Sequence, residues 1–308
     1  MADLPPNLTV LERGWLSANG IVFHAPGHPT ALVDSGYATH AGQTVALVEA
    51  ALGGRPLDRL LNTHLHSDHC GGNAALQARW PGVYTAVPPG EADAVRAWDE
   101  DALSFRPTGQ QCPRFAIDGT LQPGQEIALG DLAWQVHAAP GHDPHAVLLF
   151  EPASRTLLSA DALWATGFGV VFPEIDGAHA FDEVAATLDL IEALAPATVV
   201  PGHGPVFTEV GPALAVARRR LESFVQSPAR HAAHAARVLL KFKLLEWQRQ
   251  DLAPLLGWIG ATPLMRSLHR QGGGGLPLDA WAGGLIADLE RAGAARREGI
   301  AVVNAGTA

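Results

Sequence analysis

The chain has 308 residues, of which 47% are hydrophobic and 17% charged, and its formal net charge at pH 7 is −10. This composition excludes a disordered chain, and two cysteines are too few for a disulfide-stabilised scaffold. Because the sequence has neither a long apolar segment nor a signal-peptide pattern, we expect a cytoplasmic protein with no membrane span.

Short apolar runs alternate with longer stretches of helical periodicity along residues 1–227. The runs are bounded by Gly, Pro, Asn or Asp and predict buried strands over 21–23, 31–33, 57–61, 132–137, 156–160 and 197–200. Apolar residues at helical spacing predict helices over 41–52, 90–99, 180–194 and 212–224. Interleaved strands and helices indicate an α/β catalytic domain.

The pattern changes after residue 227, and residues 228–308 are predicted to form a small, mainly helical domain. Helices are expected over 232–247, 253–270 (as one or two helices) and 279–292, with glycines 272–275 as a flexible break. The final segment ARREGIAVVNA predicts a β-hairpin. Helices followed by a hairpin look like a winged helix, and a purely helical cap on the first domain is an equal alternative.

The two predicted domains differ in charge. Residues 1–229 contain 11 Lys and Arg against 25 Asp and Glu, whereas residues 230–308 contain 10 against 6. The acidic part would repel nucleic acid, although the basic part tolerates anions. We therefore expect a small-molecule substrate rather than nucleic acid, and leave open a homodimer formed through the C-terminal domain.

Four potential metal ligands lie directly after the predicted strand 57–61. They are His64, His66, Asp68 and His69. Imidazole and carboxylate are ligands that zinc takes at about 2.0 to 2.2 Å. A lone histidine is more often an ordinary loop or core residue, but burying this cluster without a cation would cost roughly 1 to 3 kcal/mol for each unpaired group. The loop therefore predicts a metal site that could serve two neighbouring ions.

The tripeptide Pro-Gly-His occurs three times, ending at His28, His142 and His203. His28 lies between two adjoining predicted strands and is interpreted as part of a hairpin turn. His142 and His203 follow predicted strands, and sites in α/β proteins gather at such strand ends. These two histidines are therefore candidate ligands.

Two aspartates also follow predicted strands. Asp161 comes after 156–160, where its carboxylate could bridge two cations, or alternatively cap the next turn. Asp34 comes after 31–33 and is expected to orient a ligand histidine.

The segment THLHSDH resembles the His-x-His-x-Asp-His signature of the metallo-β-lactamase superfamily. Four further segments match the remaining motifs of that family in order: LVDSG at Asp34, PGH at His142, LLSADAL at Asp161 and VVPGH at His203. Together they cover about residues 8–210. The resemblance implies an αββα sandwich, in which two β-sheets pack face to face with helices outside.

The resemblance also implies a centre of two divalent cations, zinc in the first place and iron or manganese otherwise. The first metal would be bound by His64, His66 and His142, the second by Asp68, His69 and His203, and Asp161 would bridge them. A bridging hydroxide would attack the substrate while Asp68, the catalytic residue of this scheme, orients it and shuttles its proton.

Asp161 separates the chain from true β-lactamases, which lack the bridging aspartate. The leading expectation is a hydrolase of a small ester, thioester or lactone, with glyoxalase II (hydroxyacylglutathione hydrolase) as the nearest named relative. Two departures weaken the glyoxalase II and lactonase interpretations. In glyoxalase II-like enzymes a second histidine usually follows the one at His142 by four positions, whereas His145 follows it by three. The two tyrosines, Tyr37 and Tyr84, also lie far upstream of the position at which glyoxalase II and the lactonases supply a substrate-facing tyrosine.

Three alternatives stay open. A metal-dependent ribonuclease is second, because some superfamily members joined to a winged helix cleave RNA. A mononuclear-iron sulfur dioxygenase would use only His64, His142 and Asp161. A non-catalytic scaffold would lack ligands, whereas all seven are present.

Candidate substrate-pocket residues follow Asp161. The aromatics Trp164, Phe168 and Phe172 are spaced by glycines and predict a lid over an apolar substrate group, with core packing as the alternative for at least one of them. Tyr37, shortly after Asp34, is a further candidate. The basic run 218–220 is not taken as a nucleic-acid site, because three successive charges on a helix point in different directions.

Overall fold

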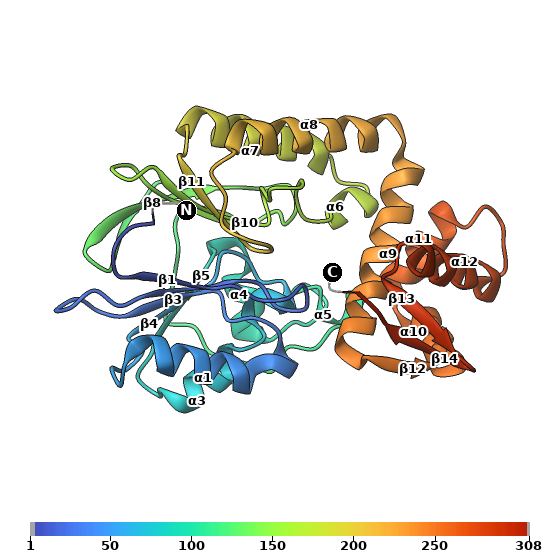
Figure 1. The fold of residues 1–308 in the computed structure, drawn as a ribbon, viewed down its shortest axis with the longest axis horizontal. Coiled ribbons are helices and arrows are strands. Elements are labelled where there is room, and N and C mark those ends of the chain that lie inside the picture. The colour runs from blue at the N-terminus through green and yellow to red at the C-terminus, as the bar shows by residue number, and fades with distance from the viewer. Residues whose placement is uncertain (1–3, 307–308) are drawn as a thin grey trace.

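The computed structural model of the protein describes residues 4–306. Two β-sheets lie face to face with helices on their outer sides, and a mainly helical C-terminal region lies beside them (Figure 1). The predicted αββα sandwich is confirmed.

The first sheet has six strands, and its outer face packs against α1 (Ala41–Leu52) and α3 (Asn73–Arg79). The strands, in sheet order, are β1 (Leu8–Leu11), β2 (Gly20–Phe23), β3 (Ala31–Val33), β4 (Arg59–Leu61), β5 (Tyr84–Val87) and β6 (Gly119–Thr120). β1 to β3 are antiparallel, and β3 to β6 are parallel. Val22 packs toward the helices while its neighbours Ile21 and Phe23 pack toward the second sheet, because successive side chains of a strand point to opposite faces.

The second sheet has five strands in the order β11 to β7. They are β7 (Glu126–Leu129), β8 (Leu132–Ala138), β9 (Val147–Glu151), β10 (Thr156–Ala160) and β11 (Thr198–Pro201). Its outer face packs against α7 (Ala180–Leu194) and α8 (Val210–Gln226), seen at the top of Figure 1. The inner face contributes Trp134 and Leu158 to the core between the sheets.

Short helices fill the loops around this sandwich. They are η1 (Ala38–His40), α2 (Ser67–Cys70), η2 (Pro89–Glu91), α4 (Ala92–Ala97), α5 (Phe105–Thr108) and α6 (Phe172–Ile175). The expectation of one helix over 90–99 was wrong in its extent: a 3₁₀ turn precedes α4, and Trp98 ends the helix in the left-handed conformation, with φ of 57°. A proline at the first position of η2 fixes where that turn begins.

The C-terminal region combines four helices with a three-stranded sheet, in the order β12-β14-β13. Its elements are α9 (Pro228–Trp247), β12 (Arg249–Asp251), α10 (Leu252–Ala261), α11 (Pro263–Gly272), α12 (Leu278–Arg291), β13 (Ala295–Glu298) and β14 (Ala301–Asn304). The predicted hairpin is confirmed as β13 and β14. β12 was not predicted, because its sequence Arg-Gln-Asp has no apolar alternation.

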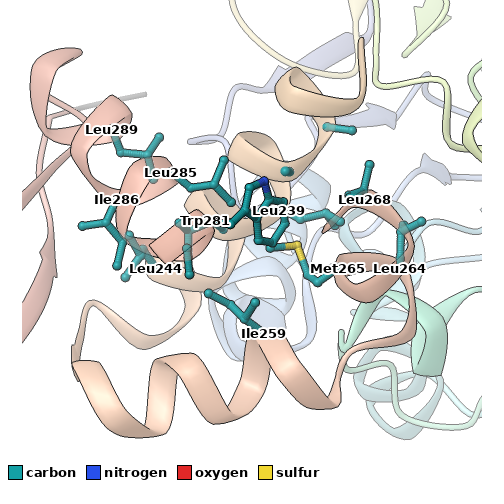
Figure 2. Packing of buried hydrophobic residues seen from close by; sticks show 14 of the residues in the cluster. Leu239, Leu244, Ile259, Leu264, Met265, Leu268, Trp281, Leu285, Ile286 and Leu289 are labelled. Carbon is teal, nitrogen blue, oxygen red and sulfur yellow. The ribbon is translucent and has the colours of Figure 1, made fainter. Parts of the chain in front are cut away.

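The helices of the C-terminal region enclose a core of their own. Figure 2 shows Leu239 and Leu244 of α9 packed with Ile259 of α10, Met265 of α11 and Trp281 of α12. This core supports a division of the chain near residue 228, which stays a prediction. Within residues 4–306, no helix combines the length and hydrophobicity that a membrane span needs.

Candidate metal centre

All seven candidate ligands converge at one edge of the sandwich. Their potential ligand atoms form three groups, in each of which the atoms lie within 4.8 Å of one another. The groups are His64 with His66 and His142, Asp68 with His69 and His203, and His64 with His69 and Asp161. The first two groups are the two expected metal sites, and Asp161 lies between them.

Four strand ends and a short helix bring these side chains together. His64 and His66 follow β4, Asp68 and His69 lie in α2, and the other three ligands follow β8, β10 and β11. At the end of β10 the register with β11 shifts between Leu158 and Ala160, and Ala160 adopts a φ of 46°. This irregularity turns Asp161 out of the strand direction.

The two Pro-Gly-His copies at the site need glycine for different reasons. Gly141 has a φ of 133°, a conformation that L-residues rarely adopt. Gly202 instead lies so close to the Asp161 carboxylate that a Cβ there would overlap it. The third copy ends at His28, which is exposed in the turn between β2 and β3 and belongs to none of the three ligand groups.

Hydrogen bonds on the outer side of the centre orient three of the imidazoles. Asp34 Oδ2 lies 2.8 Å from His69 Nδ1, Val170 O lies 2.6 Å from His142 Nδ1, and Thr63 Oγ1 lies 3.2 Å from His64 Nδ1. Each contact leaves Nε2 facing the cluster, which is how metal-binding histidines are commonly oriented. The geometry supports the role expected for Asp34.

The cluster contains buried donor atoms without partners. Among the described residues, Nε2 of His64 and Nε2 of His69 have no hydrogen bond, although both side chains are fully buried. An unsatisfied buried polar atom costs about 1 to 3 kcal/mol. A cation bound between these nitrogens would remove that cost, so the donor set fits a metal.

The electrostatics agree with this fit. Burial, together with the neighbouring histidines His69, His66 and His142, holds the pKa of His64 well below its ordinary value. Burial, with His66 beside it, lowers the pKa of His142 to about 4. Both imidazoles are therefore neutral at pH 7, the form that binds metals.

The carboxylates of the centre are ionised and attract positive charge. Burial opposes ionisation of Asp161, but His69 and His203 hold its pKa well below the ordinary value. Burial would likewise lower the pKa of His69, but Asp161 and Asp34 raise it well above normal. Buried carboxylates that draw a proton onto His69 would also favour a divalent cation.

A cavity of about 740 Å³ opens above the centre and is lined by residues from both the sandwich and the C-terminal region. Trp164, Phe168 and Phe172, the three predicted pocket aromatics, are among its lining residues. Phe168 is also packed in the core of the second sheet, so core packing applies to that residue.

Tyr37 does not belong to the residues that line this cavity. Its side chain is fully buried, and its hydroxyl donates to Glu246 Oε2 of α9 at 2.9 Å. The sequence predicted a pocket position for Tyr37, because it does not show that α9 covers this residue. Tyr37 joins the C-terminal region to the sandwich instead.

One aromatic residue of the site was not foreseen. Trp15 lines the cavity and stacks on His203, with ring centroids 5.2 Å apart and an angle of 3° between the planes. It also meets the edge of Trp164 at 5.1 Å. Trp15 precedes β2 in a segment without any recognisable motif, so only the folded chain reveals its place.

Asp34→Asn is expected to weaken zinc binding by about 10- to 100-fold, because an uncharged amide orients His69 less well. The zinc dissociation constant can be measured by competition with a chromophoric chelator. Asp182→Asn, at an exposed position in α7, is the matched control. Equal zinc affinity in Asp34→Asn and wild type would contradict the role of Asp34 in orienting a metal ligand.

Comparison with known proteins gives a consistent result. A family model described as "Metallo-beta-lactamase superfamily" matches residues 13–203. A hydroxyacylglutathione hydrolase of Acidiphilium cryptum is 35% identical over 201 residues, which cover 65% of this chain and 70% of that protein. One of Brucella anthropi is 30% identical over 176 residues, covering 56% of this chain but only 57% of that protein.

A solved structure shares the fold over almost the whole chain. The metallo-β-lactamase family protein from Thermus thermophilus is 20% identical and superposes with a TM-score of 0.56, covering 98% of this chain and 100% of that one. At this identity the similarity concerns the fold alone.

Proposed function

The chain belongs to the metallo-β-lactamase superfamily of hydrolases, and on that premise we propose that it is a dinuclear metal-dependent hydrolase of a small ester, thioester or lactone. The observation that carries the proposal is the convergence of seven ligand side chains on two adjoining groups, with Asp161 between them. The proposed catalytic domain comprises residues 1–227, and residues 228–308 form a winged-helix-like domain that helps to enclose the cavity.

The residues divide between two cation sites. His64, His66 and His142 would hold one cation, Asp68, His69 and His203 the other, and Asp161 would contact both. Two zinc ions bound there would supply Lewis acidity, which would polarise the scissile carbonyl and lower the pKa of water toward neutrality.

Asp68 is the proposed catalytic carboxylate because it both lines the cavity and belongs to the ligand cluster. Its Oδ2 lies 3.1 Å from His203 Nε2. Burial opposes ionisation, but the hydrogen bond from His203 and the charge of His69 hold the pKa of Asp68 below its ordinary value. An ionised Asp68 can accept a hydrogen bond from the attacking water, orient it and take up its proton.

The cavity walls favour an acyl substrate with an apolar portion. Trp15, Trp164 and Phe172 border the metal centre, and aliphatic side chains of α9 continue the wall away from it. Aromatic and aliphatic walls with a few convergent polar groups are typical of small-molecule sites.

The convergence of Asp68, His69 and His203 beside the first group favours this function over a one-iron dioxygenase, which would leave them unused. A metal-dependent ribonuclease is the second candidate, because arginines from α8, α9 and α12 also line the cavity.

Hydrolysis of a thioester, a lactone and a single-stranded RNA, before and after chelation, tests the proposal. We expect thioester or lactone hydrolysis to fall by about 100-fold or more on chelation and to return with added zinc. Metal-dependent cleavage of RNA alone would support the ribonuclease. Ester hydrolysis that is indifferent to chelation would refute both.

A further inference from the structure

One wall of the cavity beside the metal centre is cationic. Arg220 of α8, Arg237 of α9 and Arg291 of α12 line it together with one carboxylate, Asp288. Asp288 is shared, because it pairs with Arg237 at 3.2 Å and also with Arg291. On a chain of net charge −10, this wall is a local excess of positive charge.

Arg220 is the cation of this wall without a carboxylate partner among residues 4–306. Its Nη1 donates to Phe168 O at 3.3 Å, and its guanidinium lies 6.0 Å from the Phe168 ring. A guanidinium has five N–H donors, so most of them are left for a ligand. Its side chain is partly buried, where an unpaired charge is costly.

The other basic groups near Arg220 do not offer comparable donors. Lys241 Nζ donates to Ala294 O, Asn304 Oδ1 and Ala305 O at 2.6 to 2.9 Å, which uses all three of its N–H groups. Burial, with Arg220 and Arg237 beside it, lowers the pKa of His234 to about 4, so this imidazole is neutral at pH 7. Among the arginines of the wall, Arg237 and Arg291 share the carboxylate of Asp288, whereas the charge of Arg220 has no carboxylate beside it among the described residues.

A single loop connects Arg220 with the metal centre. The loop starts at Asp161 and reaches Gly169, whose N–H donates to Asp161 O at 2.9 Å and which lies so close to His142 that a Cβ there would overlap its ring. Arg220 contacts the same loop at Gly167 and Phe168. It therefore lines the cavity close to, but not within, the ligand cluster.

Apolar side chains of α9 also line the cavity. Val238, Leu239, Phe242 and Leu245 of α9 face it. A ligand that reaches from the metal centre to Arg220 would carry a reactive carbonyl and an anionic group, and apolar atoms between them would suit the aliphatic lining.

We propose that Arg220 binds an anionic group of the substrate. The enzyme would then be selective for esters or thioesters that carry a carboxylate several bonds from the scissile carbonyl. This inference rests on the proposed hydrolase function. An arginine and a carboxylate form two parallel charged hydrogen bonds, which gives both affinity and orientation. The cationic wall would also attract such anions to an otherwise acidic protein.

The test compares two thioesters of equal chain length, adipoyl-N-acetylcysteamine with a terminal carboxylate and hexanoyl-N-acetylcysteamine without one. A third, 3-(hexanoylthio)propanoate, places the carboxylate on the thiol side. Arg220→Gln should raise KM for the preferred charged thioester by about 10- to 100-fold and leave the hexanoyl thioester within about twofold. Arg220→Lys should restore part of the loss.

Arg219→Gln is the matched control, because it removes the same charge from an exposed position one residue away on α8. This variant should leave KM for both the charged and the neutral thioester unchanged. Equal hydrolysis of charged and neutral thioesters by the wild type, or an equal loss of both in Arg220→Gln, would overturn the proposal. Cleavage of a single-stranded RNA alone, weakened by Arg220→Gln, would also overturn it and assign Arg220 to phosphate groups.

Binding of adipate separates this inference from the proposed function. Trp15 and Trp164 line the cavity, so quenching of tryptophan fluorescence reports occupancy without turnover. If no thioester is hydrolysed, adipate binding that is weakened about tenfold or more in Arg220→Gln but not in Arg219→Gln would still support an anion site. Equal adipate binding by all three proteins would reject it.

Discussion

Asp161→Asn is expected to lower kcat/KM for the hydrolysed ester by about 100- to 1000-fold, together with a loss of bound metal. Asp161 is the carboxylate that reaches both ligand groups, with oxygens 3.3 Å from His142 Nε2, 3.4 Å from His69 Nε2 and 3.8 Å from His203 Nε2. An asparagine keeps the size of the side chain but removes the charge that holds two cations together.

The variant is measured by steady-state kinetics and by elemental analysis of the same samples. Asp182→Asn, which alters an exposed carboxylate of α7, should match the wild type in both. An active Asp161→Asn enzyme with full metal content would show that Asp161 serves as a turn cap, the alternative that its sequence position left open.

Glu246→Ala is expected to lower the free energy of unfolding by about 3 to 5 kcal/mol. Glu246 pairs with Lys243 at 2.5 Å, and the side chains of this pair are 2% and 4% exposed. Its carboxylate also accepts hydrogen bonds from Tyr37 at 2.9 Å and from Gln111 at 2.5 Å, both in the sandwich. The alanine would leave the buried Lys243 ammonium without its counter-ion.

Urea denaturation measures this loss, and two further variants interpret it. Glu298→Ala breaks the exposed Arg249–Glu298 pair, whose side chains are 55% and 42% exposed, and should cost less than about 1 kcal/mol. The double variant Lys243→Met, Glu246→Leu should recover much of the stability, because no buried charge is left unpaired. A loss for Glu246→Ala no larger than that for Glu298→Ala would contradict the account of this interface.

The metal ligands could be predicted from the sequence because they occur in dense, short motifs at strand ends. His64, His66, Asp68 and His69 share one loop, and glycine precedes both His142 and His203. Their convergence follows from the fold. The fold was predicted from the resemblance to the metallo-β-lactamase superfamily, and the match over residues 13–203 confirms that family.

The cavity wall could not be predicted in the same way, because it is made by contacts between distant segments. Trp15 meets His203 across the sandwich, and Tyr37 meets Glu246 across the boundary with the C-terminal region. The basic run 218–220 shows why the sequence alone does not predict which residues line the cavity. Arg218 pairs with Asp189 and Glu192, Arg219 is exposed, and Arg220 lines the cavity, a division that depends on how α8 packs.

The local structure that was missed has a similar cause. β12 pairs with β14 through backbone hydrogen bonds, which do not depend on an apolar side chain. The helix expected over 90–99 ends early because Trp98 adopts a left-handed conformation that its residue type does not predict.

The most direct test of the proposed dinuclear centre is elemental analysis of the wild-type protein, purified without added metal and then equilibrated with zinc and desalted. The account predicts two zinc ions per chain, because two groups of three ligands adjoin a shared carboxylate. A single ion per chain after equilibration with excess zinc would contradict it.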